Sequence, residues 1–283
     1  MKILVTNDDG YRSKGLKTLV QILKPYGEIT VVAPKYVQSG TSMAVTMGYK
    51  PIAVRQLSSS PGESWYYLDG TPASCVKFGA GELFGDGRPD VIVSGINHGG
   101  NYATAALYSG TLGAAFEGAL MSIPSIAVSL DSLDPDADFS VVERHFPPLF
   151  ELLMSHLPER FGLAYNLNFP AVAPEAVKGL RLPGQGVIRW VREFTPFDPG
   201  IYAHKGLTPQ ELGIRDLPEP GPEEAVYVME GTVVKDPANR DDCDVELIAK
   251  GYITLTAHCI LTTDREEQDR LRALGMERFL QEP

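Results

Sequence analysis

The first half of the chain alternates short apolar runs with stretches of helical periodicity. The runs at 2–6, 29–33 and 91–96 are almost continuously apolar, which is typical of strands buried on both faces of a sheet. Between the first two runs, apolar residues recur at helical spacing up to Leu23, and Pro25 and Gly27 end the pattern. This alternation predicts β-α units and an α/β fold with a mostly parallel sheet.

The same pattern continues to about residue 170. It predicts strands at 65–68, 126–130 and 164–169 and helices at 72–84, 111–121 and 139–157. Thr71 stands directly before the second predicted helix and is a candidate for its N-cap. We therefore expect a doubly wound sheet with helices on both faces.

From about residue 180 the pattern changes to short alternating segments. IRWVREF (188–194) and AVYVMEGTVV (225–234) predict β-hairpin structure, joined by the Pro/Glu-rich turn PEPGPEEA. From Asp264 a charged helix follows, with Leu271, Leu274 and Phe279 on one side. We expect this helix to pack on its own domain, with packing on a neighbouring subunit as the alternative. The chain thus divides into a core, 1–180, and an extension, 181–283.

Composition places the chain among ordinary globular proteins, with 43% apolar and 22% charged residues in a length of 283. A net charge of −11 argues against a surface that coats duplex nucleic acid. It does not argue against a small phosphorylated ligand, because local dipoles and a bound cation can outweigh the overall charge.

The sequence also predicts the cellular location of the protein. The N-terminal segment MKILVTNDDG lacks the long apolar stretch of a secretory signal, and no segment approaches the roughly 20 apolar residues of a membrane helix. Cys75, Cys243 and Cys259 are few and widely spaced, which suits a reducing compartment and offers no zinc spacing. We expect a cytoplasmic protein without a membrane partner.

Polar side chains follow the predicted strands where the strands end. Asp8 and Asp9 follow the first strand, Ser39 lies in the loop after the second, and Asn97 follows the strand at 91–96. Ligands of doubly wound sheets bind at these carboxyl ends. Adjacent carboxylates repel each other unless a cation or proton intervenes, and oxygen donors favour Mg²⁺, Mn²⁺ or Ca²⁺. The alternative is that Asn-Asp-Asp-Gly is simply a turn that enters a helix.

A second candidate element is the segment Ser109-Gly110-Thr111 at the start of the helix predicted over 111–121. Free N–H groups and hydroxyls at a helix start form an anion site, although Ser or Thr there is more often only a cap. His98 is treated as structural or solvated and stays outside the catalytic set. The sequence contains no GxSxG elbow and no P-loop, which argues against acyl-ester and NTP hydrolysis.

Five motifs together resemble the SurE family, the stationary-phase survival proteins that act as metal-dependent 5′/3′-nucleotidases. They are ILVTNDDG, the AP-x4-SG pattern at 33–40, DGTPASCV, DVIVSGIN and YSGT, and YNLNFP at 165–170 closes the match. The resemblance implies a Rossmann-like core and one divalent cation per subunit, held by Asp8, Asp9, Ser39 and Asn97. It also implies phosphate contacts from Asn101, Ser109, Gly110 and Thr111.

The same resemblance implies a phosphomonoesterase acting on nucleoside 5′- and 3′-monophosphates, with short polyphosphate as a further substrate. It implies a homodimer or homotetramer formed through C-terminal segments. The chain departs from the family in YATAAL (102–107), where a glycine and an acidic or amide residue are usual, and at Thr256-Ala257-His258. Neither departure touches the four expected metal ligands.

We expect Asp8 and Asp9 to serve catalysis by holding a metal that activates water for direct attack on phosphorus. A haloacid-dehalogenase-type phosphatase would use the strand-end Asp as nucleophile and needs a second carboxylate two positions later, where this chain has Gly10. A receiver domain would need a phospho-accepting Asp on a later strand, where this chain has Ser94 and Asn97. A non-catalytic nucleotide-binding protein on the same fold remains an alternative.

Overall fold

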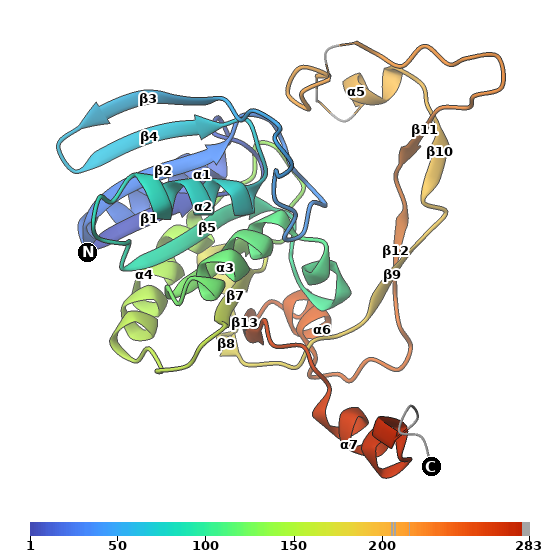
Figure 1. The fold of residues 1–283 in the computed structure, drawn as a ribbon. Coiled ribbons are helices and arrows are strands. Elements are labelled where there is room, and N and C mark those ends of the chain that lie inside the picture. Colours follow the sequence, from blue (N-terminus) through green and yellow to red (C-terminus); the bar gives the residue numbers. More distant parts are fainter. Residues whose placement is uncertain (205, 207, 215, 279–283) are drawn as a thin grey trace.

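A nine-stranded, mostly parallel sheet forms the centre of the molecule (Figure 1). The computed structural model describes residues 1–204, 206, 208–214 and 216–278. The spatial order of the strands is β3-β4-β2-β1-β5-β6-β7-β13-β8. Their bounds are β1 (Lys2–Thr6), β2 (Glu28–Pro34), β3 (Val54–Ser60), β4 (Glu63–Leu68), β5 (Val91–His98), β6 (Ser125–Leu130), β7 (Leu163–Phe169), β8 (Leu180–Arg181) and β13 (Ile253–Cys259).

Strand direction follows the predicted β-α units. From β4 through β2, β1, β5 and β6 to β7, every neighbouring pair is parallel. The exceptions lie toward the edges, where β3 pairs antiparallel with β4, and β13 pairs antiparallel with β7. The prediction of an α/β fold with a mostly parallel sheet is confirmed.

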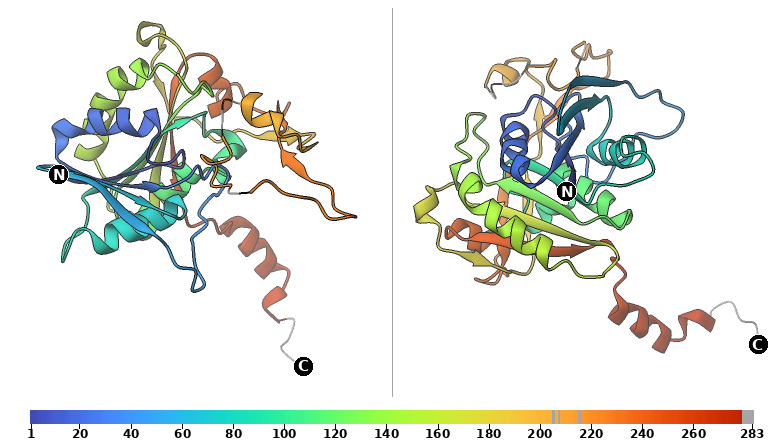
Figure 2. Two further views of the ribbon diagram at one scale, coloured as in Figure 1. Left: turned by 90° about the horizontal axis from the view of Figure 1, so that it is seen from above. Right: turned by 90° about the vertical axis from the view of Figure 1, so that its left-hand side faces the viewer.

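Helices cover both faces of the sheet (Figure 2). One face carries α1 (Lys14–Leu23) and α4 (Ser140–Ser155), which contact each other, and the other carries α2 (Pro72–Glu82) and α3 (Gly110–Leu120), which also contact each other. The strands alternate between the two layers: Leu167 packs in the α1/α4 core, whereas Ala164 packs against α3. Burial of these two apolar layers stabilises the sheet.

Side-chain caps explain where three helices begin. The hydroxyl oxygen of Ser13 accepts a hydrogen bond from the N–H of Leu16, and that of Thr71 accepts one from Ser74, both at 3.3 Å. Ser109 caps α3 in the same way, through the N–H of Leu112 at 3.1 Å. Each cap satisfies a backbone donor that the first turn leaves free. The predicted role of Thr71 is confirmed.

A long arm leaves the core after β8 (Figure 1). Near its base β9 (Ile188–Val191) pairs antiparallel with β12 (Thr232–Lys235), and farther out β10 (Phe194–Pro196) pairs with β11 (Tyr227–Met229). The short helix α5 (Gly200–His204) lies near the tip. The predicted hairpin structure is therefore present.

The chain returns from the arm to the core sheet. Helix α6 (Asp244–Ala249) leads into β13, which lies between β7 and β8 in the sheet. The division of the chain at residue 180 stays a prediction. Short 3₁₀ helices complete the described elements: η1 (Lys24–Tyr26), η2 (Ala103–Leu107), η3 (Pro174–Ala176) and η4 (Met276–Arg278).

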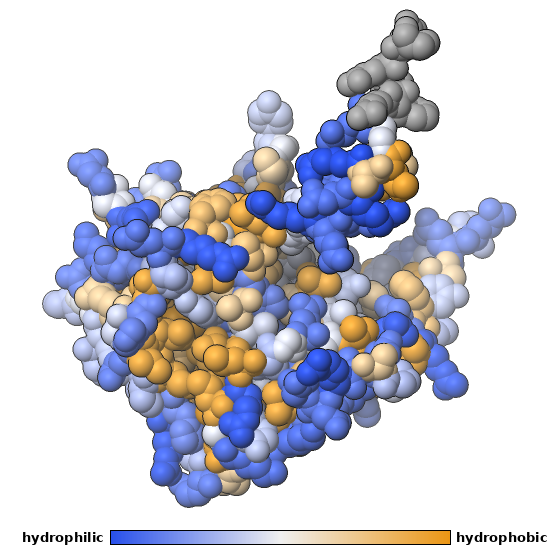
Figure 3. All heavy atoms as spheres, turned by 90° about the horizontal axis from the view of Figure 1, so that it is seen from below, coloured by the Kyte–Doolittle hydropathy of each residue, from blue (hydrophilic) through white to orange (hydrophobic). Residues whose placement is uncertain are grey.

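The terminal helix α7 (Arg265–Ala273) projects from the core and contains no buried residue. Our expectation that it packs on its own domain is wrong, because its sequence REEQDRLRA offers too narrow an apolar stripe. Leu274, at its C-cap, is 62% exposed, and Phe279 lies outside the described residues. Figure 3 shows this mostly hydrophilic segment beside a core face on which hydrophobic residues gather.

Over the described part of the chain, no helix is both long and apolar enough to cross a membrane.

Candidate functional site

The strand order reverses between β1 and β5, and this is where the candidate residues gather. The chain runs from β1 outward to β2 and β4 on one side, and then from β5 to β6 and β7 on the other. Doubly wound sheets bind ligands in the crevice at this point, beyond the carboxyl ends of the strands. Asp8 and Asp9 follow β1, and Asn97 lies near the end of neighbouring β5.

Local hydrogen bonds fix the turn that carries the two carboxylates. The side-chain amide of Asn7 donates to the carbonyl oxygen of Gly10 at 3.1 Å and to the hydroxyl of Ser13 at 2.8 Å. Gly10 has φ +90°, a region that favours glycine because it lacks a Cβ. The turn alternative raised by the sequence therefore holds for the backbone, and the carboxylates project from a rigid turn.

Asp8 is buried, with 3% of its surface exposed, at the start of α3. The hydroxyl of Thr111 donates to its Oδ1 at 2.5 Å, and the N–H of Thr111 also binds the carboxylate. Burial and the neighbouring Asp9 raise the pKa of Asp8 to about 7, although the Thr111 hydrogen bonds oppose this shift. A cation beside these carboxylates would offset the cost of burying their charge.

Asp9 is half-buried and lies against the end of β5. Its Oδ2 accepts a hydrogen bond from the backbone N–H of His98 at 3.3 Å and lies 3.4 Å from His98 Nδ1. The His98 ring packs edge-on against Phe139, with 5.2 Å between ring centroids. His98 is thus wedged between Asp9 and the α1/α4 layer, and it orients Asp9.

The amide nitrogen of the Asn97 side chain is hydrogen-bonded within the protein. Its Nδ2 donates to the carbonyl oxygens of Gly99 at 2.7 Å and His98 at 3.3 Å, which leaves Oδ1 as the atom for a ligand. The pairing of β5 with β6 shifts between Ser94 and Asn97. Gly95 permits this irregularity, because a Cβ there would lie 2.2 Å from the carbonyl oxygen of Val128.

Ser39 is exposed in the loop after β2. The N–H of Gln38 donates to the carbonyl oxygen of Asp8 at 2.7 Å, and the N–H of Ser42 donates to that of Tyr108 at 2.9 Å. Two backbone bonds therefore hold the loop that carries Ser39 between the Asp8 turn and the start of α3.

Gly110 lies where α3 meets Asp8. A Cβ on Gly110 would lie 2.9 Å from Cβ of Asp8 and 3.0 Å from the hydroxyl of Thr41, so the position admits no larger side chain without movement. Ser109 uses its hydroxyl oxygen to cap the helix and keeps its hydroxyl hydrogen for another acceptor. The positive end of the α3 dipole thus faces the carboxylates.

Asn101 lies over the ends of β6 and β7, where it is 7% exposed. Its Nδ2 donates to the hydroxyl of Ser129 at 2.9 Å, and its backbone N–H donates to Oδ1 of Asn168 at 2.7 Å. The side-chain amide of Asn166 donates to its carbonyl oxygen at 2.7 Å. Asn101 is therefore fixed through both its backbone and its side chain.

Sequence reasoning missed a buried carboxylate that ties the extension to this region. Asp244 is 2% exposed and accepts hydrogen bonds from the N–H groups of Ala103 at 2.7 Å and Gly186 at 2.8 Å. Thr104 also exchanges hydrogen bonds with the backbone of Ile188 in the arm. Asp244 stands among other acidic residues, so its sequence context gave no signal of burial.

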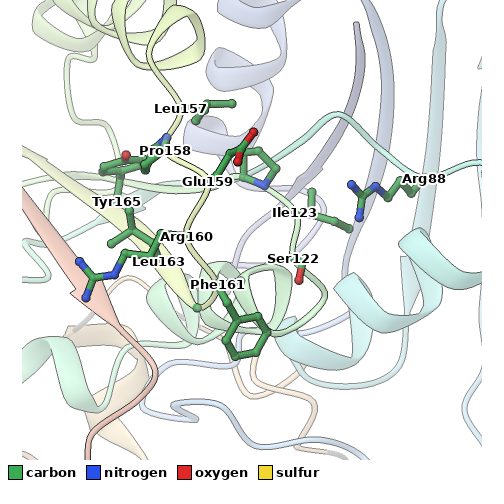
Figure 4. A pocket seen from close by; sticks show the side chains of 13 residues that line it. Arg88, Ser122, Ile123, Leu157, Pro158, Glu159, Arg160, Phe161, Leu163 and Tyr165 are labelled. Carbon is green, nitrogen blue, oxygen red and sulfur yellow. The ribbon is translucent and has the colours of Figure 1, made fainter.

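A separate cavity of about 350 Å³ lies at the opposite ends of the strands, beside the amino ends of β6 and β7 (Figure 4). Arg88 and Arg160 lie on opposite sides of it and are exposed. Because ligands of this fold class bind at the carboxyl ends of the strands, we do not assign this cavity to the candidate site.

The donors at the carboxyl ends are oxygens. No cluster of three or more His, Cys, Asp or Glu side chains that could hold a metal occurs among the described residues. The set here has two carboxylates, with the amide oxygen of Asn97 and the hydroxyl of Ser39 nearby. Such donors fit a hard divalent cation, and the pKa of Asp8 is raised first by burial and then by the neighbouring Asp9, two costs of the charged carboxylate that a cation would offset.

Comparisons with known proteins show which family the chain resembles. Residues 3–192 match the family model described as survival protein SurE. A protein of Syntrophomonas wolfei named 5′-nucleotidase SurE is 35% identical over 257 residues, which are 90% of this chain and 88% of the relative. One of the same name from Cytophaga hutchinsonii is 40% identical over 199 residues, 70% of this chain and 76% of the relative.

A solved structure shares the architecture. The crystal structure of the SurE protein from Aquifex aeolicus superposes with a TM-score of 0.73 at 25% identity, covering 96% of this chain and 99% of that one. The extensive match to the family model and the similarity to curated relatives lead to one conclusion. This chain belongs to the SurE family.

Proposed function

We propose that this protein is a 5′-nucleotidase that hydrolyses nucleoside 5′-monophosphates to nucleoside and phosphate with a divalent cation. Its curated relatives from several bacteria are named 5′-nucleotidase SurE. The observation that carries the proposal is the meeting of Asp8, Asp9 and the N-terminus of α3 at the strand reversal. This meeting supports the proposal, because carboxylates suit a cation and a helix N-terminus suits a phosphate.

In this proposal Asp8, Asp9, Ser39 and Asn97 hold the cation. Thr111 fixes Oδ1 of Asp8 and leaves Oδ2 as a ligand, and the backbone N–H of His98 orients Asp9. The hydrogen bonds from Asn97 to backbone carbonyls present its Oδ1. When bound, Mg²⁺ or Mn²⁺ would neutralise charge on the phosphoryl oxygens and lower the pKa of a water ligand.

We propose that Ser109, Gly110 and Asn101 hold the phosphoryl group, and that Thr111 acts at this site through Asp8, to which its hydroxyl and its N–H both donate. The start of α3 and the Ser109 hydroxyl hydrogen supply donors, and Gly110 lets this helix start lie directly against Asp8, because it carries no Cβ. The second N–H of the Asn101 amide remains for the same anion. These residues position the substrate and stabilise its charge, which are the main demands of phosphoryl transfer.

We further propose that water attacks phosphorus directly. Asp8 is buried and its Oδ1 is held by Thr111, so it is poorly placed as a nucleophile, and position 10 offers no second carboxylate. The test is rapid acid quenching with ³²P-labelled AMP, followed by mass spectrometry of the intact protein. Direct attack leaves no label on the protein. A kinetically competent aspartyl-phosphate would support the haloacid-dehalogenase-type alternative instead.

A phosphate-release assay tests the proposed activity. Purified protein is incubated with AMP, GMP, 3′-AMP, short polyphosphate and p-nitrophenyl phosphate, each with Mg²⁺, with Mn²⁺ and with EDTA. We expect metal-dependent release from 5′-monophosphates, and we extend the proposal to 3′-monophosphates and short polyphosphate. Nucleotide binding without release under every metal condition would favour a non-catalytic binding protein.

Two further properties belong to the same proposal. The projecting α7 and the extended arm support assembly into a homodimer or homotetramer, because each exposes side chains that the core does not cover. The free thiols of Cys75, Cys243 and Cys259 support a cytoplasmic location.

A further inference from the structure

A polar layer lies inside the protein on the α3 face of the sheet. Asn166 and Asn168 occupy alternate positions of β7, so both side chains point to this face, while Leu167 and Phe169 point to the α1/α4 core. Asn166 is fully buried and Asn168 is 1% exposed. Two buried amides on a central strand require partners, because an unpaired amide in this environment is costly.

The neighbouring strands extend this layer. Ser129 of β6 and Thr254 of β13 pair in register with Asn168, and Thr256 pairs with Asn166. All three residues are buried. Yet the hydrogen bonds of the two asparagines converge on one residue outside the sheet, Asn101 in the loop after β5.

Asn101 is held at three points by this layer. Oδ1 of Asn168 accepts its backbone N–H at 2.7 Å, the side-chain amides of Asn166 and Asn168 donate to its carbonyl oxygen at 2.7 and 3.3 Å, and the Ser129 hydroxyl accepts from its Nδ2 at 2.9 Å. Asn168 also donates to Oδ1 of Asn166 at 3.3 Å, which fixes the orientation of both amides. These hydrogen bonds from β6 and β7 therefore fix the orientation of the Asn101 side chain.

We propose that Asn166 and Asn168 are positioning residues of the phosphatase reaction, acting through Asn101. They lock the backbone of Asn101, and Ser129 takes one hydrogen of its amide, so that the other hydrogen points at the phosphoryl group. This inference rests on the proposed function and assigns a role to the YNLNF segment of β7. Neither asparagine touches the substrate.

The first test measures kinetics of the full-length protein with AMP and Mn²⁺. Asn168→Ala and Asn166→Ala should lower kcat/KM by about 10- to 100-fold, mainly through KM, because a buried group loses a hydrogen-bond partner and the phosphate contact is misplaced. Inhibition by inorganic phosphate should weaken in parallel, while the Mn²⁺ concentration for half-maximal activity stays unchanged. Thr254→Val is the control: it is buried beside Asn168 and its hydroxyl has no hydrogen-bond partner among the described residues.

A double-mutant cycle separates positioning from a general structural role. In an Asn101→Ala background, adding Asn168→Ala should lower kcat/KM for AMP by less than about threefold, because the side chain that Asn168 positions is already absent. Ser129→Ala, which affects only the side chain of Asn101, should raise KM even if the asparagine variants do not fold. Unchanged KM for AMP in these variants, or full additivity with Asn101→Ala, would overturn the inference. An inactive wild-type protein would instead contradict the proposed function.

Discussion

At the scale of single residues, the acidic pair was predictable and its environment was not. The position of Asp8 and Asp9 at a strand end follows from the apolar run before them. Their unequal burial does not, because it depends on α3, which lies about a hundred residues later in the chain. The bonds from Thr111 to Asp8 likewise belong to tertiary structure, whereas the sequence pointed only to a helix start.

Burial of Asp8 predicts a pH dependence of stability in the presence of EDTA. The pKa of Asp8 rises from 3.8 in the unfolded state to about 7 in the folded state, so the folded protein keeps this proton up to a higher pH. The free energy of unfolding therefore falls as the pH rises from about 4 to 7. At about 1.36 kcal/mol per pKa unit, the free energy of unfolding is lower by at most about 4 kcal/mol above pH 7. Asp8→Asn should remove most of this loss.

Urea unfolding at pH 5, 6, 7 and 8 measures this effect. The stability of Asp8→Asn relative to the wild type should grow between pH 5 and 7 and then level off. Asp86→Asn, which removes an exposed carboxyl, serves as the control. A constant difference between Asp8→Asn and the wild type across this range would show that Asp8 is not buried as described.

At the scale of elements, periodicity located the strands and helices that build the site. The predicted strands at 91–96 and 126–130 correspond to β5 and β6, and the helix at 111–121 corresponds to α3. The solvent-exposed strand β3 carried no such signal, since every residue in it is exposed. The alternating asparagines of β7 were visible in the sequence, but their shared target in a distant loop was not.

The start of α3 carries a prediction about division of labour. Ser109→Ala removes the N-cap, which costs about 1 kcal/mol of stability, and in our proposal also a hydrogen bond to phosphate. Loss of a hydrogen bond to a charged group costs roughly 1.5–3 kcal/mol, so kcat/KM for AMP should fall about 10- to 150-fold. Asp264→Ala removes the cap of distant α7 and should leave kcat/KM unchanged.

Steady-state kinetics and Mn²⁺ titration together test this prediction. Ser109→Ala should keep the metal affinity of the wild type. If kcat/KM is unaffected, or if the metal is lost, the separation between metal-binding and phosphate-binding residues is wrong.

At the scale of the whole molecule, the arm contacts two of the loops that carry the site, one near its base and one near its tip. Its base is tied to the loop after β5 through Asp244 and Thr104. Near its tip, the backbone carbonyl oxygen of Glu211 accepts a hydrogen bond from the N–H of Val37 in the loop after β2. Local patterns could predict the hairpins but not this return to the core, since such contacts leave no periodic signal. The projection of α7, by contrast, agrees with the narrow apolar stripe of its sequence, which our expectation of packing on the core had overestimated.

Removal of α7 tests the proposed assembly. A chain ending at Thr263 should show a lower oligomer mass by light scattering, because α7 buries nothing in its own core and is free to bind another subunit. The far-ultraviolet circular dichroism of the core should persist. An unchanged mass would place the subunit contacts elsewhere.

The central claim is that the carboxylates at the strand reversal bind the cation on which phosphate release depends. Its most direct test is the initial rate of phosphate release from saturating AMP as a function of Mn²⁺ concentration, in the wild type and in Asp9→Asn. The account predicts a saturable rise for the wild type and a rate lower by orders of magnitude for the variant, with the fold unchanged. Equal rates for both proteins at limiting Mn²⁺ would contradict it.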